Sequence, residues 1–229
     1  MCTDPMPLLQ LLQLADSAVP IGSAAHSFGL ETLVQDGLSV DELTLWFTGY
    51  LAEAGRLDAA AARTAHRSAF LADTEFIQQW INLNQKLSAL KSGRESRNAS
   101  STLGRRFLSL AAALAAEDLR LRQASVAARQ PGGVTHHCVA FGLVAARLGI
   151  AEETAAVVYL QQSIMGLVSA CQRLMPLGQQ QASGILWALK KPIVEAAQSA
   201  NIDEAAPFLP TLDLAAMRHP YLSTRLFIS

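Results

Sequence analysis

Cysteine is scarce in this chain of 229 residues: it has only Cys2, Cys138 and Cys171, and no two of them form a C-x-x-C pair. An odd number of separated cysteines argues against a disulfide framework and fits a reducing compartment. The first residues, Met1 to Pro5, carry no basic stretch, and the apolar run after them is too short for a signal peptide. We therefore expect a cytoplasmic protein.

Charged residues are also few, at 16% of the chain, and they nearly cancel, leaving a net charge of −1. Proteins that bind nucleic acids present clustered basic residues, so this balance argues against nucleic acid as a partner. Hydrophobic residues reach 51% of the chain. We expect part of that apolar surface to meet other proteins.

Two long stretches, 154–172 and 174–189, contain no charged residue and raise the question of a membrane span. Both are interrupted by polar or helix-breaking residues, among them Gln161, Gln162 and Pro176. Amide side chains near the middle of a span are costly in lipid. The two stretches are therefore expected to be buried helices, with no membrane involved.

Motifs of nucleotide hydrolysis and zinc proteolysis are missing, because the chain has no G-x-x-x-x-G-K-[ST] and no H-E-x-x-H. We expect no catalytic residues and no cofactor. One alternative is a serine hydrolase, since the segment from Ala25 to Gly29 resembles an elbow that would expose Ser27 as a nucleophile. That elbow requires a strand just upstream, where this chain has Pro20. The competing interpretation is a loop that feeds a helix starting near Ser23.

A second alternative is a nickel-binding helical protein that uses His136, His137 and Cys138, which form a local cluster of soft or borderline metal ligands. Adjacent residues on a helix point about 100° apart, so they rarely chelate one ion. The simpler interpretation places these residues at the start of a helix, in ordinary polar contacts. We therefore expect no metal site.

What the chain does have is apolar residues at the spacing of a helix. Alanine and leucine are abundant and are strong helix formers. Apolar residues recur three and four positions apart, and clear period-2 alternation is absent. The pattern predicts an all-α fold, and the stretches that carry it begin at Leu43, Phe76, Leu103 and Val157.

The whole chain, 1–229, is expected to form a single domain: a helical bundle of about eight to ten helices with short loops. Residues 1–6 and roughly 211–229 are expected to be flexible tails. Glycine, proline, serine or charged residues cluster at the expected breaks between helices. These breaks are 16–22, 91–102, 129–133 and 201–210.

Two local signals mark helix ends. Ser39 with Glu42 three residues later forms a capping-box pattern, which would satisfy two backbone amides at a helix start. Further along, Pro176 is expected to end one apolar helix, Gly178 to permit a sharp reversal, and Gln179 to bond to freed carbonyls. The simplest interpretation of the second signal is a helix–helix turn, and a contact surface is the alternative.

The end of the chain is unusually apolar. Chain ends are commonly polar and poorly ordered, because an untethered end gains nothing by ordering. Here apolar and aromatic residues must bury, either on their own helices or on a partner, and aromatic residues with arginine are frequent interface anchors. The residues concerned are Arg218, Tyr221, Leu222, Arg225, Leu226, Phe227 and Ile228.

Taken together, five blocks of sequence resemble the urease accessory protein UreF family, in order and over nearly the whole chain. They run from Leu11 to Gly22 with Ser27 to Glu31, from Arg94 to Arg97 with Gly104, from His137 to Gly142 with Leu148 and Gly149, from Pro176 to Gln179, and from Met217 to His219 with Arg225 to Phe227 and the final Ser229.

The chain departs from the family pattern in two places. Residues 24–27 read Ala-Ala-His-Ser, where the family usually has Phe-Ser-Tyr-Ser. In the tail, Pro220, residues 222–224 and Ile228 stand where the family usually has Glu, Gln-Tyr-Ser and Arg. Contacts that the family makes through those side chains are not expected to carry over.

The resemblance implies an all-helical, non-catalytic protein that helps to mature nickel-dependent urease. Members of the family form homodimers and bridge the scaffold UreD or UreH and the GTPase UreG, and the complex delivers nickel to apo-urease. The resemblance places the partner-binding residues in the tail. These are Arg218, His219, Tyr221, Leu222, Arg225, Leu226, Phe227 and Ser229.

The resemblance also implies a second surface, which shapes the dimer or faces the GTPase. Part of it is a basic strip that could otherwise be a solvated helix face or a patch for an acidic partner. The residues of this surface are Gly29, Leu30, Glu31, Arg94, Arg97, Pro176, Leu177, Gly178 and Gln179.

Overall fold

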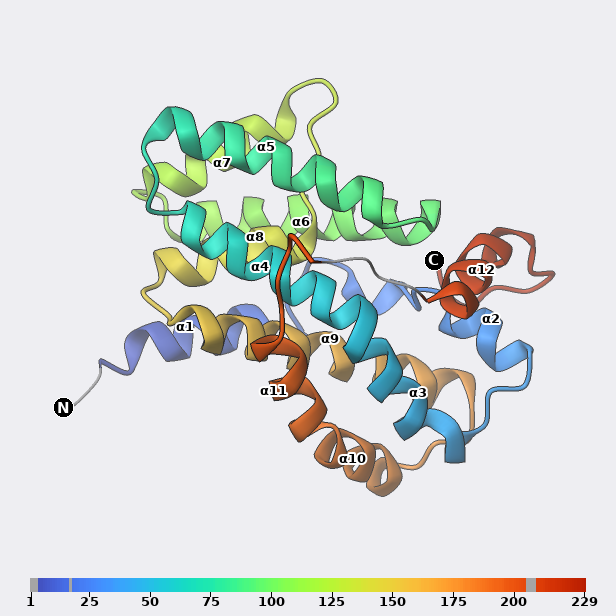
Figure 1. The fold of residues 1–229 in the computed structure, drawn as a ribbon. Coiled ribbons are helices and arrows are strands. Elements are labelled where there is room, and N and C mark those ends of the chain that lie inside the picture. Colours follow the sequence, from blue (N-terminus) through green and yellow to red (C-terminus); the bar gives the residue numbers. More distant parts are fainter. Residues whose placement is uncertain (1–3, 17, 205–208) are drawn as a thin grey trace.

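The computed structural model describes residues 4–16, 18–204 and 209–229. In these residues helices account for all the regular structure and no strand occurs, so the predicted all-α class is confirmed (Figure 1). They form twelve α-helices, or ten if α3 is joined with α4 and α10 with α11, which follow each other almost without interruption. The predicted number of helices is therefore also confirmed. The bounds are α1 (Met6–Ala15), α2 (Leu30–Gln35), α3 (Leu43–Tyr50), α4 (Arg56–Ser68), α5 (Asp73–Leu90), α6 (Arg94–Leu114), α7 (Leu119–Arg129), α8 (His137–Arg147), α9 (Glu152–Leu174), α10 (Gln179–Ala188), α11 (Lys190–Gln198) and α12 (Pro210–Arg218).

Shorter helical segments complete the chain path. Three are 3-10 turns, η1 (Ser23–Ala25), η2 (Val40–Glu42) and η4 (His219–Tyr221). The fourth, η3 (Leu51–Gly55), is a π-helical segment that joins α3 to α4. Such π-segments are rare and are frequently found at functional sites.

Helix α8 is the centre of the core, since every residue from Cys138 to Ala146 is buried. It packs on α4, α6 and α9. The small residues of α4, including the run from Ala59 to Ala62, let the two helices approach closely. A Cβ atom on Gly142 would collide with the backbone of Ala62, so glycine is required at that crossing.

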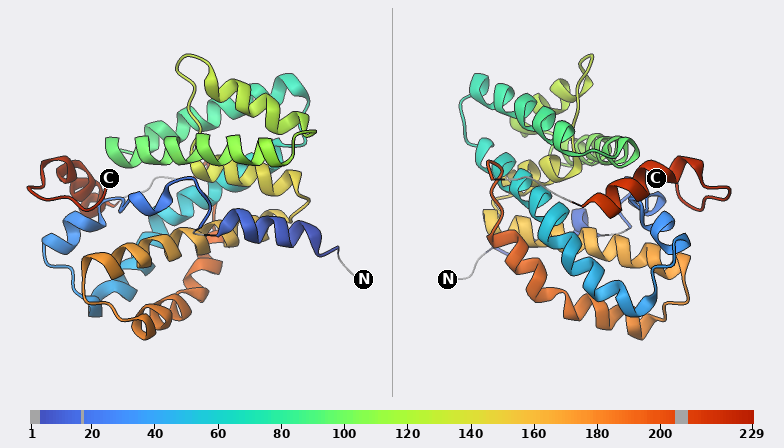
Figure 2. Two further views of the ribbon diagram at one scale, coloured as in Figure 1. Left: turned by 180° about the vertical axis from the view of Figure 1, so that it is seen from behind. Right: turned by 45° about the vertical axis from the view of Figure 1, so that its right-hand side comes forward.

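The remaining helices surround this centre. Helices α5 and α7 lie above α4 and α8 in Figure 1, α10 and α11 lie below, and α2 and α12 lie together at the right-hand end. The two further views show the same arrangement, with α1 running along the outside of the bundle (Figure 2). The predicted apolar stripe of α5 is confirmed, because Phe76, Trp80, Leu83 and Leu87 are all buried.

The predicted capping box is also confirmed. Glu42 Oε2 accepts hydrogen bonds from the backbone N–H of Ser39 at 2.9 Å and from its hydroxyl at 2.7 Å. The predicted turn at 129–133 follows α7 directly. Of the predicted break at 201–210, residues 205–208 lie outside the described part of the chain, as do residue 17 and residues 1–3.

Two predicted boundaries were wrong. The break expected over 91–102 is confined to 91–93, and α6 begins at Arg94. The charged residues of α6 are exposed or half-buried, while its other face, including Leu103 and Gly104, is buried. The helix expected near Ser23 begins only at Leu30, because the backbone at Phe28 is left-handed and cannot continue a helix.

Helix α9 is long and apolar enough to cross a membrane by length and composition alone. Half of its most apolar window is buried inside the fold, where it packs on α4, α8, α10 and α11. Helix α9 therefore has the position of a core helix. Buried core helices can meet the same criterion of length and apolar composition.

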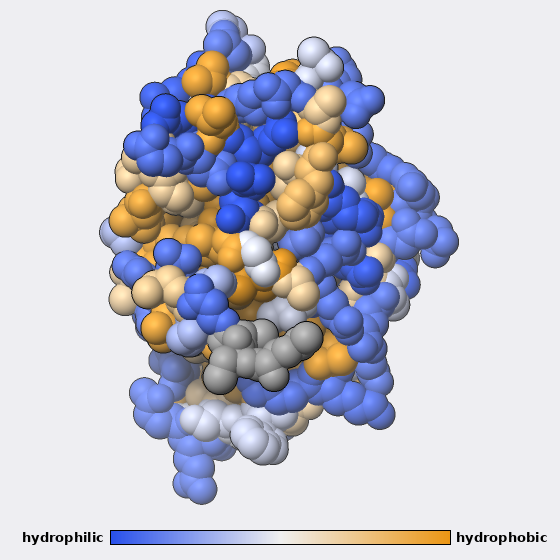
Figure 3. Space-filling model, turned by 90° about the vertical axis from the view of Figure 1, so that its left-hand side faces the viewer, coloured by the Kyte–Doolittle hydropathy of each residue, from blue (hydrophilic) through white to orange (hydrophobic). Residues whose placement is uncertain are grey.

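Apolar residues also reach the surface. Figure 3 shows them gathered among hydrophilic residues on the face that forms the left-hand side of Figure 1, where α1 begins. In α1, Met6, Leu8, Leu9 and Leu12 are each about half exposed, while Leu11 and Leu14 are buried. The molecule therefore displays apolar side chains beyond those that its own core uses.

Candidate functional site

The C-terminal segment, residues 209–229, folds back beside α2 near the start of the chain (Figure 1). Phe28 has a φ of 52° and Gly29 a φ of 92°, so two left-handed residues follow each other just before α2. Turns of this kind direct successive backbone N–H groups towards one acceptor. The N–H groups of Ser27 and Phe28 both donate to the backbone oxygen of Ser229, the second at 3.1 Å.

Ser229 is held by further groups of the same loop. The Ser27 hydroxyl donates to the backbone oxygen of Ser229 at 3.0 Å, and His26 Nδ1 lies 2.7 Å from the Ser229 hydroxyl. The N–H of Ile228 donates to the backbone oxygen of Ala25 at 2.9 Å. Ser229 is buried as a result, so the loop forms a fitted seat for the last residues.

Glu31 on α2 is the second anchor. Its Oε1 accepts a hydrogen bond from the N–H of Leu226 at 2.6 Å, and its Oε2 accepts one from the N–H of Phe227 at 3.1 Å and lies 2.9 Å from His219 Nε2. Burial tends to raise the pKa of this carboxyl, but the hydrogen bonds from Leu226, His219 and Phe227 outweigh it and hold the pKa below its usual value. The side chain is therefore a buried carboxylate with its acceptor positions in use.

His219 joins this carboxylate to a second one. Its ring is fully buried, and Nδ1 lies 2.7 Å from Glu95 Oε2 on α6. His219 thus lies between Glu31 and Glu95 and ties the C-terminal segment to α2 and α6 together. Arg225 adds a looser contact to Glu95, at 3.8 Å.

Apolar contacts divide the segment into an inner and an outer face. Phe227 is buried, and the Arg173 guanidinium of α9 lies 4.2 Å from the centre of its ring. Tyr221, Leu226 and Ile228 are 87%, 60% and 68% exposed. The segment is therefore held by its backbone and by buried side chains, His219 and Phe227 among them, while large apolar side chains point away from the fold.

Arg218 makes the remaining charged contact. Its guanidinium bonds both oxygens of Asp36, at 2.7 and 3.1 Å, in a bidentate pair. Both side chains are substantially exposed, so solvent screens the pair and it contributes little stability. Leu222, which follows η4, is half-buried.

The second predicted surface is divided in the structure. Gly29, Leu30 and Glu31 lie at the C-terminal segment, and a Cβ atom on Gly29 would come within 3.2 Å of the backbone nitrogen of Ala216 in α12. Arg97 Nη1 instead bonds the backbone oxygen of Lys91 at 2.6 Å. Arg94 is exposed at the start of α6.

The turn from Pro176 to Gln179 joins α9 to α10, as the sequence predicts. Leu177 is buried, and the other three residues of the turn are exposed. We expected Gly178 to permit a sharp reversal that other residues could not make. This was wrong, because Gly178 has a φ of −68°, which any residue can adopt. Gln181 Oε1 accepts a hydrogen bond from the N–H of Gly178 at 3.3 Å and so caps the start of α10, which differs from the bond to freed carbonyls expected of Gln179.

Sequence analysis did not identify Asp36, Glu95 or Arg173 as contacts of the C-terminal segment. Glu95 belongs to a strip whose spacing resembles a solvated helix face, and its partner His219 is 124 residues away in the chain. No local pattern pairs such distant residues. In the sequence, the uncommonly apolar end of the chain is the signal that marks the site.

Comparison with known proteins decides the family. A protein-family model described as UreF matches residues 38–190, and that is more than half of the chain. The chain belongs to the UreF family. The urease accessory protein UreF of Nostoc sp. is 34% identical over 227 residues, which cover 96% of this chain and 95% of that protein. The UreF of Lachnoclostridium phytofermentans is 33% identical over 230 residues, 97% and 98% of the two chains. The UreF of Trichormus variabilis is 32% identical over 227 residues, 96% and 95%.

In this UreF family member, Ser27 is not placed as a nucleophile. The hydrolase alternative required a strand before residue 25, and the described residues there form α1, a turn and η1. Ser27 is fully buried, and its hydroxyl donates to Ser229. That alternative was wrong, because Ser27 is part of the seat of the C-terminal segment.

The nickel-binding alternative also lacks support from the geometry. His136 is the N-cap of α8, and its ring nitrogens lie 3.1 Å from the Ser100 hydroxyl and 2.9 Å from the Ser88 hydroxyl. Cys138 Sγ instead faces Asp58 Oδ1 at 3.7 Å. Across the part of the chain that the structure describes, no three His, Cys, Asp or Glu side chains are grouped so that they could hold a metal.

Proposed function

We propose that this chain is a non-catalytic adaptor in the maturation of nickel-dependent urease. In this proposal it bridges the scaffold UreD or UreH and the GTPase UreG in the cytoplasm while nickel is delivered to apo-urease. Membership of the UreF family supports the proposal, since the relatives are named as urease accessory proteins. The chain would hold its partners in place and would itself make and break no bond.

The observation that carries the proposal is the division of the C-terminal segment into an inner and an outer face. His219, Phe227 and Ser229 are buried in their own fold. Tyr221 and Leu226 are exposed on a backbone that Glu31 and the loop hold in place. A segment ordered before binding loses less conformational entropy when a partner arrives. We therefore assign the scaffold-binding surface to the outer face, together with Arg218, Leu222 and Arg225, and assign the buried residues the task of shaping it.

The second surface is proposed to form a homodimer or to face the GTPase. Exposed Arg94 and the exposed residues Pro176, Gly178 and Gln179 are available for contact. The other residues of this surface would act by shaping it, because they are buried or bonded to their own backbone. These are Gly29, Leu30, Glu31, Arg97 and Leu177. Light scattering over a range of protein concentrations would test the dimer.

The decisive experiment is a pull-down of the full chain with UreD or UreH and with UreG. Leu226→Asp and Ile228→Asp change exposed side chains without touching the backbone contacts that hold the segment. Interface anchors of this size contribute enough energy that losing one weakens binding on the order of 10-fold or more. Both variants are expected to lose scaffold capture while their thermal unfolding stays unchanged.

A matched control is Leu119→Asp on α7, where the leucine is 68% exposed. It introduces the same charge at a similarly exposed position and is expected to keep scaffold capture. Undiminished capture by Leu226→Asp and Ile228→Asp, or by a chain lacking residues 222–229, would exclude the C-terminal segment as the docking surface. If the unaltered chain captured neither partner, the adaptor role itself would be excluded.

A further inference from the structure

Helices α5 and α7 lie beside each other at one edge of the bundle, at the top of Figure 1 and of both views in Figure 2. Arg120 Nη1, at the start of α7, bonds Asp73 Oδ1, at the start of α5, at 3.1 Å. The guanidinium of Arg120 also lies 4.5 Å from the centre of the Phe76 ring. Both helices therefore begin at the same end and run in the same direction.

A groove of about 630 Å³ lies between these two helices. Ile77 and Ile81 face it from α5, and Leu119, Arg122 and Val126 face it from α7. The spacing of three and four residues puts each set on one face of its helix. The groove therefore follows the two helices lengthwise.

Apolar side chains form much of this groove and remain open to solvent. Ile77 is half-buried and packs against the core, so it lies at the floor. Ile81, Leu119 and Val126, on the walls, are 38%, 68% and 59% exposed. Exposed apolar groups scattered singly are ordinary, but a concave set of this kind marks a contact with another molecule.

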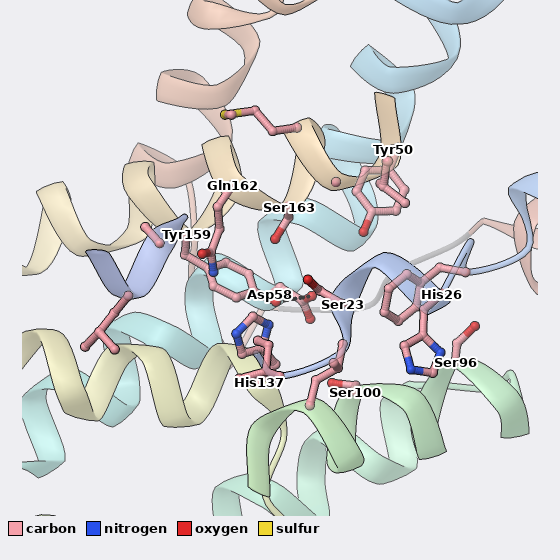
Figure 4. A pocket seen from close by; sticks show the side chains of 18 of the residues that line it. Ser23, His26, Tyr50, Asp58, Ser96, Ser100, His137, Tyr159, Gln162 and Ser163 are labelled. Atoms are coloured by element: carbon pink, nitrogen blue, oxygen red, sulfur yellow. Dashed lines mark hydrogen bonds between the residues drawn. The ribbon is translucent and has the colours of Figure 1, made fainter. Parts of the chain in front are cut away.

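The interior cavity of the fold is different in kind. It measures about 120 Å³, and Figure 4 shows it surrounded by side chains such as Tyr159 and His26. Charged, polar and apolar side chains of the fold line it together, including Asp16, Asp58 and Lys91. Such a mixed lining favours no single class of ligand, whereas the groove combines an apolar surface with one charged residue.

The shape of the groove suits a helix. From Ile77 to Gln85, the stretch of α5 that lines it covers about 12 Å, or about two turns. Two helices side by side present ridges and grooves into which the side chains of a third helix fit. Small molecules prefer sites that enclose most of their surface, and this groove is open along its walls. An amphipathic helix that lays its apolar face between α5 and α7 is therefore the occupant that fits.

Arg122 determines the charge of that helix. It is the one charged side chain among the described residues that line the groove. Its side chain is 52% exposed, and its contact with Glu117 is long, at 3.9 Å, and open to solvent, so it contributes little. Arg129, about two turns further along α7, is also exposed. A carboxylate held over the groove would thus find a guanidinium able to form two parallel hydrogen bonds with it.

We propose that this groove binds an amphipathic α-helix of another protein, with an apolar stripe about two turns long and an acidic side chain beside the stripe. The apolar stripe packs over Ile77 between α5 and α7, and the acidic side chain pairs with Arg122. The groove is separate from the two surfaces of the proposed function, since neither includes a residue of α5 or α7. The proposal therefore does not rest on the adaptor role.

The test uses fluorescently labelled synthetic peptides and the full chain. Each peptide has about 18 residues, enough to form a helix, and carries leucines three and four positions apart. Glutamates flank the leucines in the first peptide and lysines flank them in the second. The third peptide has the residues of the first in an order that scatters the leucines around the helix. In fluorescence anisotropy the first peptide is expected to bind saturably, and on the order of 10-fold more tightly than the other two.

Substitutions in the groove have matched controls on α11. Val126→Asp is expected to weaken binding of the first peptide on the order of 10-fold, and Val194→Asp, the same change at a 38% exposed position, to leave it unchanged. Arg122→Glu should reverse the preference, so that the lysine peptide binds more tightly than the glutamate peptide. Lys191→Glu makes the same change of charge on an 85% exposed side chain and should keep the original preference.

Two further variants separate this groove from the scaffold-binding surface. Leu119→Asp changes the groove and leaves the C-terminal segment as it is, so it should lose the peptide and keep scaffold capture. Leu226→Asp should do the reverse. The peptide titration contains no partner protein, so its outcome is independent of the adaptor role.

No saturable binding of the first peptide would overturn the proposal, as would equal binding of the second or the third. Undiminished binding by Val126→Asp would place the peptide elsewhere on the chain and overturn it too. If light scattering showed that the unaltered chain associates and that Val126→Asp makes it monomeric, a second copy would be the occupant and the proposal would also fall. The comparison of the three peptides uses the unaltered chain, so it decides the question even if a variant fails to fold.

Discussion

Glu31 Oε2 and His219 Nε2 lie 2.9 Å apart although 188 residues separate them in the chain. Glu31 is 3% exposed and His219 is fully buried. A carboxylate so deeply buried is stable only when it is paired or hydrogen-bonded. The contact therefore fixes how the C-terminal segment crosses α2, and it sets the direction in which Leu226 and its neighbours face solvent.

We expect Glu31→Gln to release the end of the C-terminal segment. A glutamine has one acceptor oxygen, and its NH₂ group would face one of the donors that the carboxylate now accepts. Removing a partner from buried hydrogen bonds costs about 1–3 kcal/mol. Hydrogen exchange at the amides of Leu226 and Phe227 should speed up, and the free energy of unfolding should fall by about that amount.

The control for this change is Glu42→Gln. Glu42 is exposed in the capping box and bonds only Ser39 in the described contacts. Its substitution should leave the exchange of Leu226 and Phe227 as it is in the unaltered chain. Equal protection in Glu31→Gln and Glu42→Gln would contradict the role given to Glu31.

Stability should fall as the solution becomes mildly acidic. Burial, joined for His136 by the charge on Lys91, lowers the pKa of His136 to about 3, and burial lowers that of His137 to about 4, from an ordinary 6.5. Below pH 6.5 the unfolded chain therefore binds protons that the folded chain refuses. Each histidine should reduce the free energy of unfolding by about 1.4 kcal/mol per pH unit until its folded pKa is reached.

Urea unfolding between about pH 7 and about pH 5 measures this slope. His137→Phe removes one of these groups and should make the decline shallower over that range, while His136 and His26, whose pKa burial also lowers, maintain the rest of it. The window lies above the ordinary pKa of carboxyl groups, so Glu31 contributes little to it. An unchanged slope in His137→Phe would show that His137 is not held neutral by its surroundings.

The sequence could predict those features of the fold that depend on local sequence patterns. The spacing of Phe76, Trp80 and Leu83 identified a buried helix face, and Ser39 with Glu42 identified a helix start, because both depend on residues within two turns of each other. The boundary at Arg94 was missed because a polar face and a loop have similar compositions. The late start of α2 depends on the left-handed backbone of Phe28, and few sequence signals mark a non-glycine residue in that conformation.

The candidate site was predicted only in outline. The apolar end of the chain pointed to a contact surface, but which residues face inward depends on partners such as Glu95 and Arg173 in distant helices. Ile228 illustrates the difference. Its backbone bonds Ala25 while its side chain is 68% exposed, so the isoleucine side chain determines what the segment displays and not how it is held.

The ion pair of Lys91 and Asp58 should be costly to break on one side. Their side chains are 17% and 11% exposed, and the two atoms are 2.6 Å apart. Lys91→Met would leave a buried carboxylate without its counter-charge, which costs about 3–5 kcal/mol. The double variant Lys91→Met with Asp58→Asn should recover most of that loss, because it removes both charges.

Denaturant unfolding of the two single variants and the double variant gives the coupling energy of the pair. Lys86→Met is the control, because Lys86 and its partner Asp203 are 43% and 85% exposed. Solvent screens that pair, so the change should cost less than about 1 kcal/mol. Similar losses in Lys91→Met and Lys86→Met would contradict the buried character of the first pair.

The same small substitution should have opposite effects at two glycines. A Cβ atom at Gly142 would collide with the backbone of Ala62, so Gly142→Ala must push α8 away from α4 at the centre of the core. Overpacking of this kind typically costs about 1–3 kcal/mol, and a cost near the upper end is expected here because the obstacle is backbone and cannot rotate aside.

At Gly184 in α10 nothing lies within 4 Å of the added Cβ. Gly184→Ala should therefore stabilise the helix, by about 0.5–1 kcal/mol, since alanine loses less backbone entropy on folding. Thermal unfolding of the two variants gives the sign of each change in stability directly. A Gly142→Ala chain as stable as the unaltered one would mean that α4 and α8 are farther apart than in this structure.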